Sequence, residues 1–136
     1  MANYNIRARE AAIVSFARTP IGKAYRGAFN DTGAPALAGA AIAAAVERAG
    51  VDPAEIDDSI MGCAMPQGSS GLNIGRSAAL AAGLPVTVSG MTIDRQCSSG
   101  MMAIATASKQ IIADGMTTVV GGGVESISLV QNENQN

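Results

Sequence analysis

A thiol stands between a strand-like run and a helix-like run, in residues 94–100 (DRQCSSG). The unpaired N–H groups and the dipole of a helix start favour a thiolate there. The small residues after Cys97 leave room for a substrate carbonyl, and the Cys97 backbone N–H could hold a developing oxyanion. The spacing therefore predicts a nucleophile on a strand-to-helix turn. A buried structural cysteine at a helix start is an alternative that the spacing leaves open.

Activation of that thiol is a separate question, because the chain contains no histidine. An unperturbed thiol has a pKa of about 8.5, so only a few per cent of it is thiolate at neutral pH. A helix N-terminus contributes ~0.3–1 kcal/mol, which moves the thiol pKa by less than one unit. We therefore expect the base or cation that activates Cys97 to come from elsewhere.

The other candidates for chemistry are weaker. Cys63 lies in an apolar run (SIMGCAM), which indicates a core cysteine. The glycines at 121–123 and the stretch GSSGLNIG at 68–75 fit neither G-x-G-x-x-G nor a P-loop, so they indicate no phosphate site. Three scattered basic residues could meet an anionic ligand but are typical of a solvated surface: Arg18, Lys23 and Arg26.

The composition indicates one folded domain, because 48% of the 136 residues are hydrophobic and only 15% are charged. The net charge of −2 gives no electrostatic case for binding nucleic acid. Two cysteines do not make a disulfide framework and suit a reducing cytosol. With no secretory signal and no run of about 20 apolar residues, we expect a cytoplasmic protein that does not enter membranes.

The elements that must position Cys97 alternate along the chain. Strands are predicted over 10–16, 59–65, 86–93 and 117–121. Helices are predicted from a Thr32 cap with Pro35 in its first turn to residue 49, from an Asn73 cap to residue 82, and from the end of DRQCSSG to about residue 114. The order β-α-β-α-β-α-β predicts an α/β fold with a largely parallel sheet and helices on both faces. The helix after Cys97 is apolar nearly all round, which suggests an incomplete unit.

The chain resembles the N-terminal half-domain of the thiolase family. Four stretches carry the match in the family's order, and they cover nearly the whole chain: ARTPIGKAYRGAF at 17–29, NIGRSAALAAGLP at 73–85, DRQCSSGMMAI at 94–104 and VVGGGVESIS at 119–128. The CSSG reading resembles the degradative 3-ketoacyl-CoA type, since acetoacetyl-CoA thiolases more often read CGSG. Decarboxylating ketoacyl synthases share the fold but usually carry a motif closer to ACSSS.

The resemblance implies that Cys97 takes the acyl group from a 3-ketoacyl-CoA and releases acetyl-CoA, in the thiolysis of fatty acid metabolism or the reverse Claisen condensation. Such covalent catalysis splits one difficult step in two. Coenzyme A would be a substrate, with no permanently bound cofactor and no metal. The family also implies a five-stranded sheet, dimers formed partly through the strand near 86–93, and often tetramers.

The departures from the family are as informative. Thiolases add a loop domain that binds CoA and a C-terminal half with GHP, CxG and NEAF motifs, none of which occurs here. We therefore interpret residues 1–136 as a truncated thiolase N-terminal domain, inactive or nearly so alone and able to pair with itself or with a complementary C-terminal thiolase chain. The alternatives are a non-catalytic remnant that keeps a dimerisation surface and, further off, an independent nucleotide-binding α/β domain.

Overall fold

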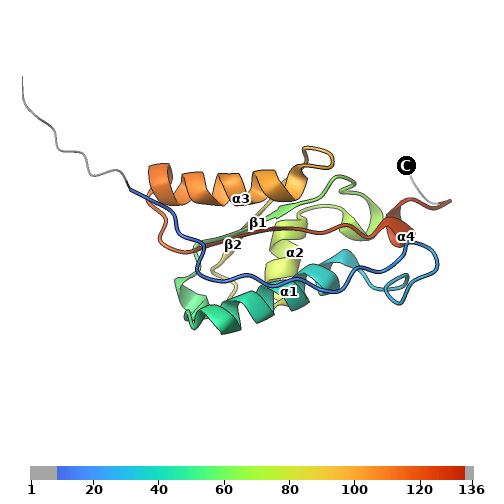
Figure 1. Cartoon of the computed structure of the whole chain (residues 1–136), viewed down its shortest axis with the longest axis horizontal. Helices are drawn as coiled ribbons and strands as arrows, with labels where there is room; N and C mark the ends of the chain where they lie inside the picture. Colours follow the sequence, from blue (N-terminus) through green and yellow to red (C-terminus); the bar gives the residue numbers. More distant parts are fainter. Residues whose placement is uncertain (1–8, 134–136) are drawn as a thin grey trace, which may run out of the picture.

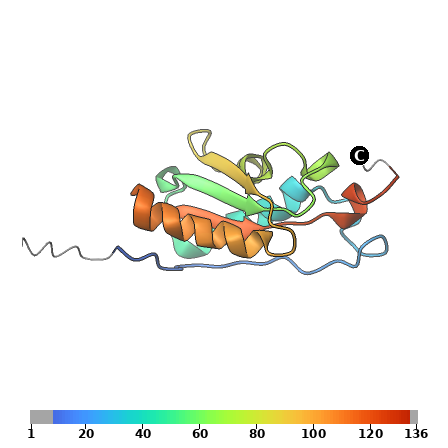
Figure 2. The ribbon, with the colours of Figure 1, turned by 90° about the horizontal axis from the view of Figure 1, so that it is seen from above.

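The centre of the molecule is a three-stranded parallel sheet. The computed structural model describes residues 9–133, and in it the strands β1 (Asp58–Gly62), β2 (Ser89–Ile93) and β3 (Val119–Gly123) lie in the order β2-β1-β3. In the register, Gly62 is level with both Ile93 and Gly123, so all three carboxyl ends finish at one edge (Figure 2). That edge is where open parallel sheets bind ligands.

Helices cover both faces of this sheet, as the sequence predicts. Helix α3 (Ser99–Lys109) lies on one face, and α2 (Ile74–Ala81) with α1 (Ala34–Ala49) lies on the other (Figure 1). The central strand β1 serves both layers because alternate side chains point to opposite faces. Ile60 packs with Ala103 and Ala107 of α3, whereas Met61 belongs to the larger core cluster against α1 and α2.

The helix ends follow from local signals. The Asn73 side chain accepts a hydrogen bond from the Arg76 N–H at 3.1 Å and so caps α2, as predicted. Gly50 and Gly115 have positive φ values of 66° and 82° after α1 and the five-residue π-helical extension of α3 (Gln110–Asp114). The predicted Thr32 cap is wrong, since Gly33 is the N-cap of α1 and gives no side-chain hydrogen bond.

The predicted strand at 10–16 is also wrong. This segment runs outside the layers without pairing (Figure 2), and Ile13 and Phe16 are 78% and 83% exposed. A side-chain hydrogen bond from Arg48 Nη1 to the Phe16 carbonyl at 3.0 Å attaches its end to α1. Apolar, β-branched sequence makes a strand only where the backbone finds a sheet edge. The described residues therefore have three sheet strands, where the resemblance implied five.

The other strands differ from prediction only at their ends. The Arg76 guanidinium donates to the carbonyls of Val86 and Val88, so β2 begins at Ser89 rather than at 86. Asp57 accepts the N–H groups of Thr117 and Thr118, so β3 begins at Val119 rather than at 117. Short helices complete the described chain: η1 (Pro53–Glu55), η2 (Gly68–Ser70) and α4 (Ile127–Val130). None of the described helices is long and apolar enough to cross a membrane.

Candidate active site

Cys97 lies at the tip of a tight turn between β2 and α3. Gln96 adopts a left-handed conformation with φ of 50°, and its N–H donates to Asp94 Oδ1 at 2.9 Å. Ser99 closes the turn from the helix side, because its Oγ accepts the Arg95 N–H at 2.8 Å and donates to the Gln96 carbonyl at 2.6 Å. The backbone on both sides of the thiol is thus fixed by short-range bonds, while the Cys97 side chain remains exposed.

The thiol borders a shallow hollow of about 270 Å³ at the carboxyl edge of the sheet. The hollow is lined by residues of the Cys97 turn and by the ends of β1 and β3: Gly62, Gln96, Cys97, Ser99, Gly100, Gly123, Val124 and Glu125. The position agrees with the prediction that Cys97 lies beyond the carboxyl end of a strand. The space is open to solvent, so a bulky thioester could reach the sulfur.

Glycines form the floor under the start of α3. A methyl group added at Gly62 would overlap the backbone of Ser99, and one added at Gly123 would lie 2.9 Å from the Gly100 Cα. Gly121 likewise packs near the Ile104 Cα, at 3.0 Å from where its Cβ would be. Gly121 and Gly123 therefore let α3 lie close against the sheet, whereas a methyl group at Gly122 would meet the Met61 sulfur at 3.2 Å.

The two cysteines occupy opposite environments. Cys63 is fully buried, as predicted for a core cysteine, whereas Cys97 is exposed. Burial, and then the hydrogen bond and charge of Glu125, raise the pKa of the Cys63 thiol to about 12. Cys63 is consequently a protonated, inaccessible thiol at neutral pH. Of the two cysteines, only Cys97 has the exposure that a nucleophile needs.

Glu125 is a residue of the site that the sequence reasoning missed. Its Oε1 accepts from Cys63 Sγ at 3.2 Å and from the Met65 N–H at 3.0 Å, and its Oε2 accepts from the Ala64 N–H at 3.0 Å. A signal was present, because Glu125 comes two residues after β3 and Cys63 one residue after β1, and parallel strands share a carboxyl edge. Its two oxygens already have three donors, so Glu125 is a poor candidate for the base that Cys97 lacks.

The remaining candidates lie away from the thiol. Arg18, Lys23 and Arg26 are exposed and do not line the hollow, which agrees with a solvated surface. Within residues 9–133, no group of three or more Cys, Asp and Glu side chains is arranged to hold a metal ion.

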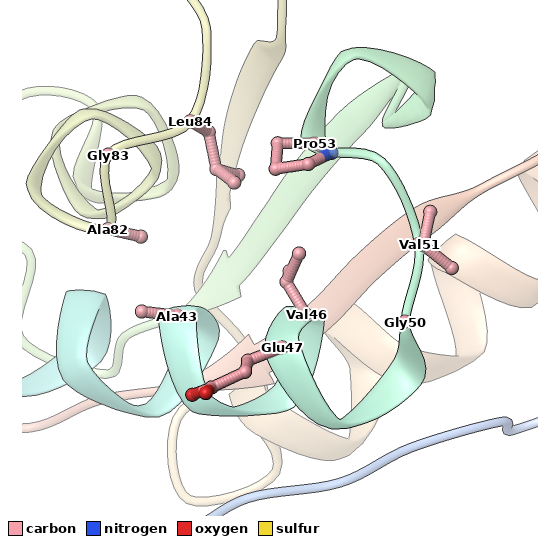
Figure 3. Close-up of a pocket in the computed structure, with 9 residues that line it drawn as sticks. All are labelled: Ala43, Val46, Glu47, Gly50, Val51, Pro53, Ala82, Gly83 and Leu84. Atoms are coloured by element: carbon pink, nitrogen blue, oxygen red, sulfur yellow. The ribbon is translucent and has the colours of Figure 1, made fainter.

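A second hollow of about 240 Å³ lies between the end of α1 and the end of α2. Val46, Pro53 and Leu84 point toward one another across it (Figure 3). Glu47 is the only ionisable side chain in its lining, so this hollow offers no acid–base pair. Chemistry is therefore concentrated at the Cys97 edge.

Comparison with known proteins identifies the family. Residues 11–136 match the model of the thiolase N-terminal domain. The chain is 43% identical to a 3-ketoacyl-CoA thiolase of Bacillus subtilis (strain 168) over 122 residues, which are 90% of this chain and 31% of that protein. It is 44% identical to an acetyl-CoA acetyltransferase of Cupriavidus necator over 119 residues, covering 88% of this chain and 30% of that protein.

A solved structure gives the same result. The crystal structure of the Bacillus anthracis acetyl-CoA acetyltransferase superposes with a TM-score of 0.83 and 44% identity, over 89% of this chain and 30% of that one. The chain thus spans about three tenths of the length of the relatives it matches. Relatives of both the ketoacyl and the acetyl type match at similar identity, so these identities do not separate the two types. The fold, the order of motifs and these matches together show that the chain belongs to the thiolase family.

Proposed function

We propose that this chain supplies the acyl-accepting cysteine of a thiolase. In the proposed step, the Cys97 thiolate attacks the keto carbon of a 3-ketoacyl-CoA, an S–C bond forms, and acetyl-CoA leaves after C–C cleavage and protonation. A CoA thiol then takes the acyl group and restores the free cysteine. The observation that carries the proposal is the exposed Cys97 on a fixed strand-to-helix turn at the carboxyl edge of the sheet.

The turn also supports the second half of this chemistry. A tetrahedral intermediate on Cys97 carries an oxyanion, and backbone N–H groups at a fixed turn stabilise such charge without reorganising. The Cys97 N–H is the candidate donor. The Gly62 and Gly123 floor keeps the helix start close to the sheet ends, so an acyl group would meet backbone rather than bulky side chains.

A complementary polypeptide would supply the base. The chain has no histidine, and Glu125, the carboxylate in the lining of the hollow, already accepts hydrogen bonds from three donors. The outer side of α3 and of its π-helical extension supports this view, since Met101, Ile104 and Ile112 are 69%, 43% and 49% exposed. Apolar side chains gathered on one helix are typical of a surface that another element covers. We propose a thiolase C-terminal segment, in the same or another chain, as that element, with self-association through β2 as the family resemblance implies.

Acyl mapping tests the proposal. The purified 136-residue chain is incubated with acetoacetyl-CoA, with and without a separately expressed thiolase C-terminal polypeptide, and quenched in acid so that thioesters survive. We expect an acetyl group on the peptide that contains Cys97, much more of it when the second polypeptide is present, and none after Cys97→Ala. Absence of the adduct in both samples, with a folded chain, would favour the non-catalytic remnant.

Turnover is the second part of that test. The chain alone should show little or no thiolase turnover, because it has no histidine to act as the base for Cys97. Turnover by the isolated chain at a rate typical of enzymes would show that it contains its own base, and the proposed division of labour would be wrong.

A further inference from the structure

The Glu125 carboxylate joins the ends of β1 and β3 beyond the last backbone hydrogen bond between them. Glu125 follows β3, and its three hydrogen-bond donors, Cys63, Ala64 and Met65, are the residues that leave β1. One backbone bond continues the pairing just before it, from the Val124 N–H to the Gly62 carbonyl at 3.0 Å. Beyond that bond, hydrogen bonds to the Glu125 side chain, in place of bonds between the backbones, connect β3 to the residues that follow β1.

The two joined strand ends support the Cys97 turn from below. Gly62 meets the backbone of Ser99, and Gly123 meets that of Gly100, without any intervening side chain. Contacts between backbones transmit a displacement directly, because packed interiors have low compressibility. A separation of the ends of β1 and β3 would therefore tilt the first turn of α3 and the N–H groups next to Cys97.

We propose that Glu125 is a positioning residue for Cys97, which holds the ends of β1 and β3 together so that the turn keeps its geometry for acyl transfer. This inference rests on the function proposed above. Glu125 acts through the backbone of residues 62–65 and 123–124 and takes no part in bond making. A carboxylate suits the task, since it offers two oxygens that both accept, whereas an amide offers one.

Two reactions of the Cys97 thiol distinguish a thiol held in the geometry for acyl transfer from one that is only exposed to solvent. With p-nitrophenyl acetate, the Cys97 thiolate forms an S–C bond, an oxyanion develops, and p-nitrophenolate leaves with the C–O bond electrons. With iodoacetamide, the thiolate displaces iodide at a saturated carbon and no oxyanion forms. Donor geometry around the thiol accelerates the first reaction alone. The ratio of the two rate constants thus reports the geometry of the turn, and differences in thiolate content largely cancel.

The experiment measures this ratio at Cys97 by peptide mass spectrometry in the folded chain and in the chain unfolded in urea. We expect the folded chain to exceed the unfolded one, and Glu125→Gln to lower the folded ratio about tenfold, in line with the loss of one well-placed charge-assisted hydrogen bond. The pH midpoint of alkylation should change little. Glu55→Gln, which removes the same charge from an exposed residue of η1, should match the wild type.

The outcomes are distinguishable. If the wild-type chain shows no higher ratio folded than unfolded, both the proposed function and this inference are overturned. If the ratio is higher in the folded wild-type chain than in the unfolded one, but the folded Glu125→Gln variant has the same ratio as the folded wild type, only the inference about Glu125 is overturned. Should Glu125→Gln lose the native circular dichroism spectrum, Glu125→Asp decides, because it keeps the charge but is one methylene too short to reach all three donors. A ratio unchanged in a folded Glu125→Asp variant would then contradict the inference.

Discussion

Gly62 and Ser99 meet backbone to backbone, at the point where the central strand passes under the first turn of α3. No side chain of any size fits between them. This contact fixes how deeply the helix start, and with it the Cys97 turn, lies against the sheet. The geometry of the site therefore depends on Gly62, although this residue has no side chain.

Substitution of Gly62 by alanine should destabilise the fold and displace the turn. The added methyl group would overlap the Ser99 backbone, and overpacking of this kind costs about 1–3 kcal/mol in the free energy of unfolding. Urea denaturation measures the loss. Gly33→Ala is the control, because a methyl group there would lie 3.8 Å from the nearest atom, Pro35 Cδ, so only the poorer N-cap preference of alanine should act, at a cost of no more than about 1 kcal/mol. Equal stability of the two variants would contradict the close contact.

The two cysteines should differ sharply in reactivity. Iodoacetamide at neutral to mildly alkaline pH should modify Cys97 in the native chain and leave Cys63 unmodified, because burial and Glu125 raise the pKa of Cys63 to about 12. Peptide mass spectrometry assigns the label to each site. In urea both cysteines should react at comparable rates. Slow labelling of both sites at equal rates in the native chain would contradict this assignment and favour a remnant without an active thiol.

The elements most accurately predicted from the sequence carry their own end signals. Helix α2 begins after Asn73 and ends just before Gly83, because a cap and a left-handed glycine act within a few residues. The segment 10–16 has no such local determinant. Its sequence resembles a strand, but pairing depends on a sheet edge distant in the chain, and no pairing occurs. Boundaries of β2 and β3 were misplaced for the same reason, since Arg76 and Asp57 set them from other elements.

The candidate site divides in the same way. Cys97 could be singled out because strand, small residues and helix adjoin it in the sequence. Glu125 could not be assigned a partner, since its bond to Cys63 links positions 62 residues apart. The contact of Gly62 with Ser99 was equally hidden, because a glycine in an apolar run gives no indication of which backbone approaches it. The nucleophile could be predicted from its neighbours in the sequence. The residues of other elements that hold it in place could be identified only from the three-dimensional structure.

Replacement of Asn73 by alanine should destabilise α2 and loosen its attachment to β2. Asn73 Oδ1 accepts from the Arg76 N–H, and Nδ2 donates to the Gly90 carbonyl at 2.7 Å, so one side chain caps the helix and ties it to the strand. We expect a loss of about 1–2 kcal/mol in the free energy of unfolding. Asp52→Ala removes a cap from the three-residue helix η1, where the side chain accepts the Ala54 N–H, and should cost less. The prediction is wrong if both variants have the same urea midpoint.

Asp57 should make stability depend on acid pH. Hydrogen bonds from the Thr117 N–H, then the Thr118 N–H and the Thr117 hydroxyl, outweigh a smaller opposing effect of desolvation and hold the pKa of Asp57 below its ordinary value. A lowered folded-state pKa stabilises the fold above the unfolded-state value of about 3.9, and this contribution is lost as pH falls through the folded-state pKa.

Asp57→Asn should therefore lower the free energy of unfolding at neutral pH, by roughly 1 kcal/mol because the carboxylate is exposed and screened. The difference between variant and wild type should begin to shrink as pH falls below the unfolded-state value of about 3.9, and it should be lost as pH falls further through the lower folded-state pKa. Urea denaturation at neutral and acid pH measures both values. Asp31→Asn, at another exposed aspartate, should show no comparable difference at either pH. A constant difference between Asp57→Asn and the wild type across this range would mean that the geometry of the side chain, and not its charge, joins β1 to the start of β3.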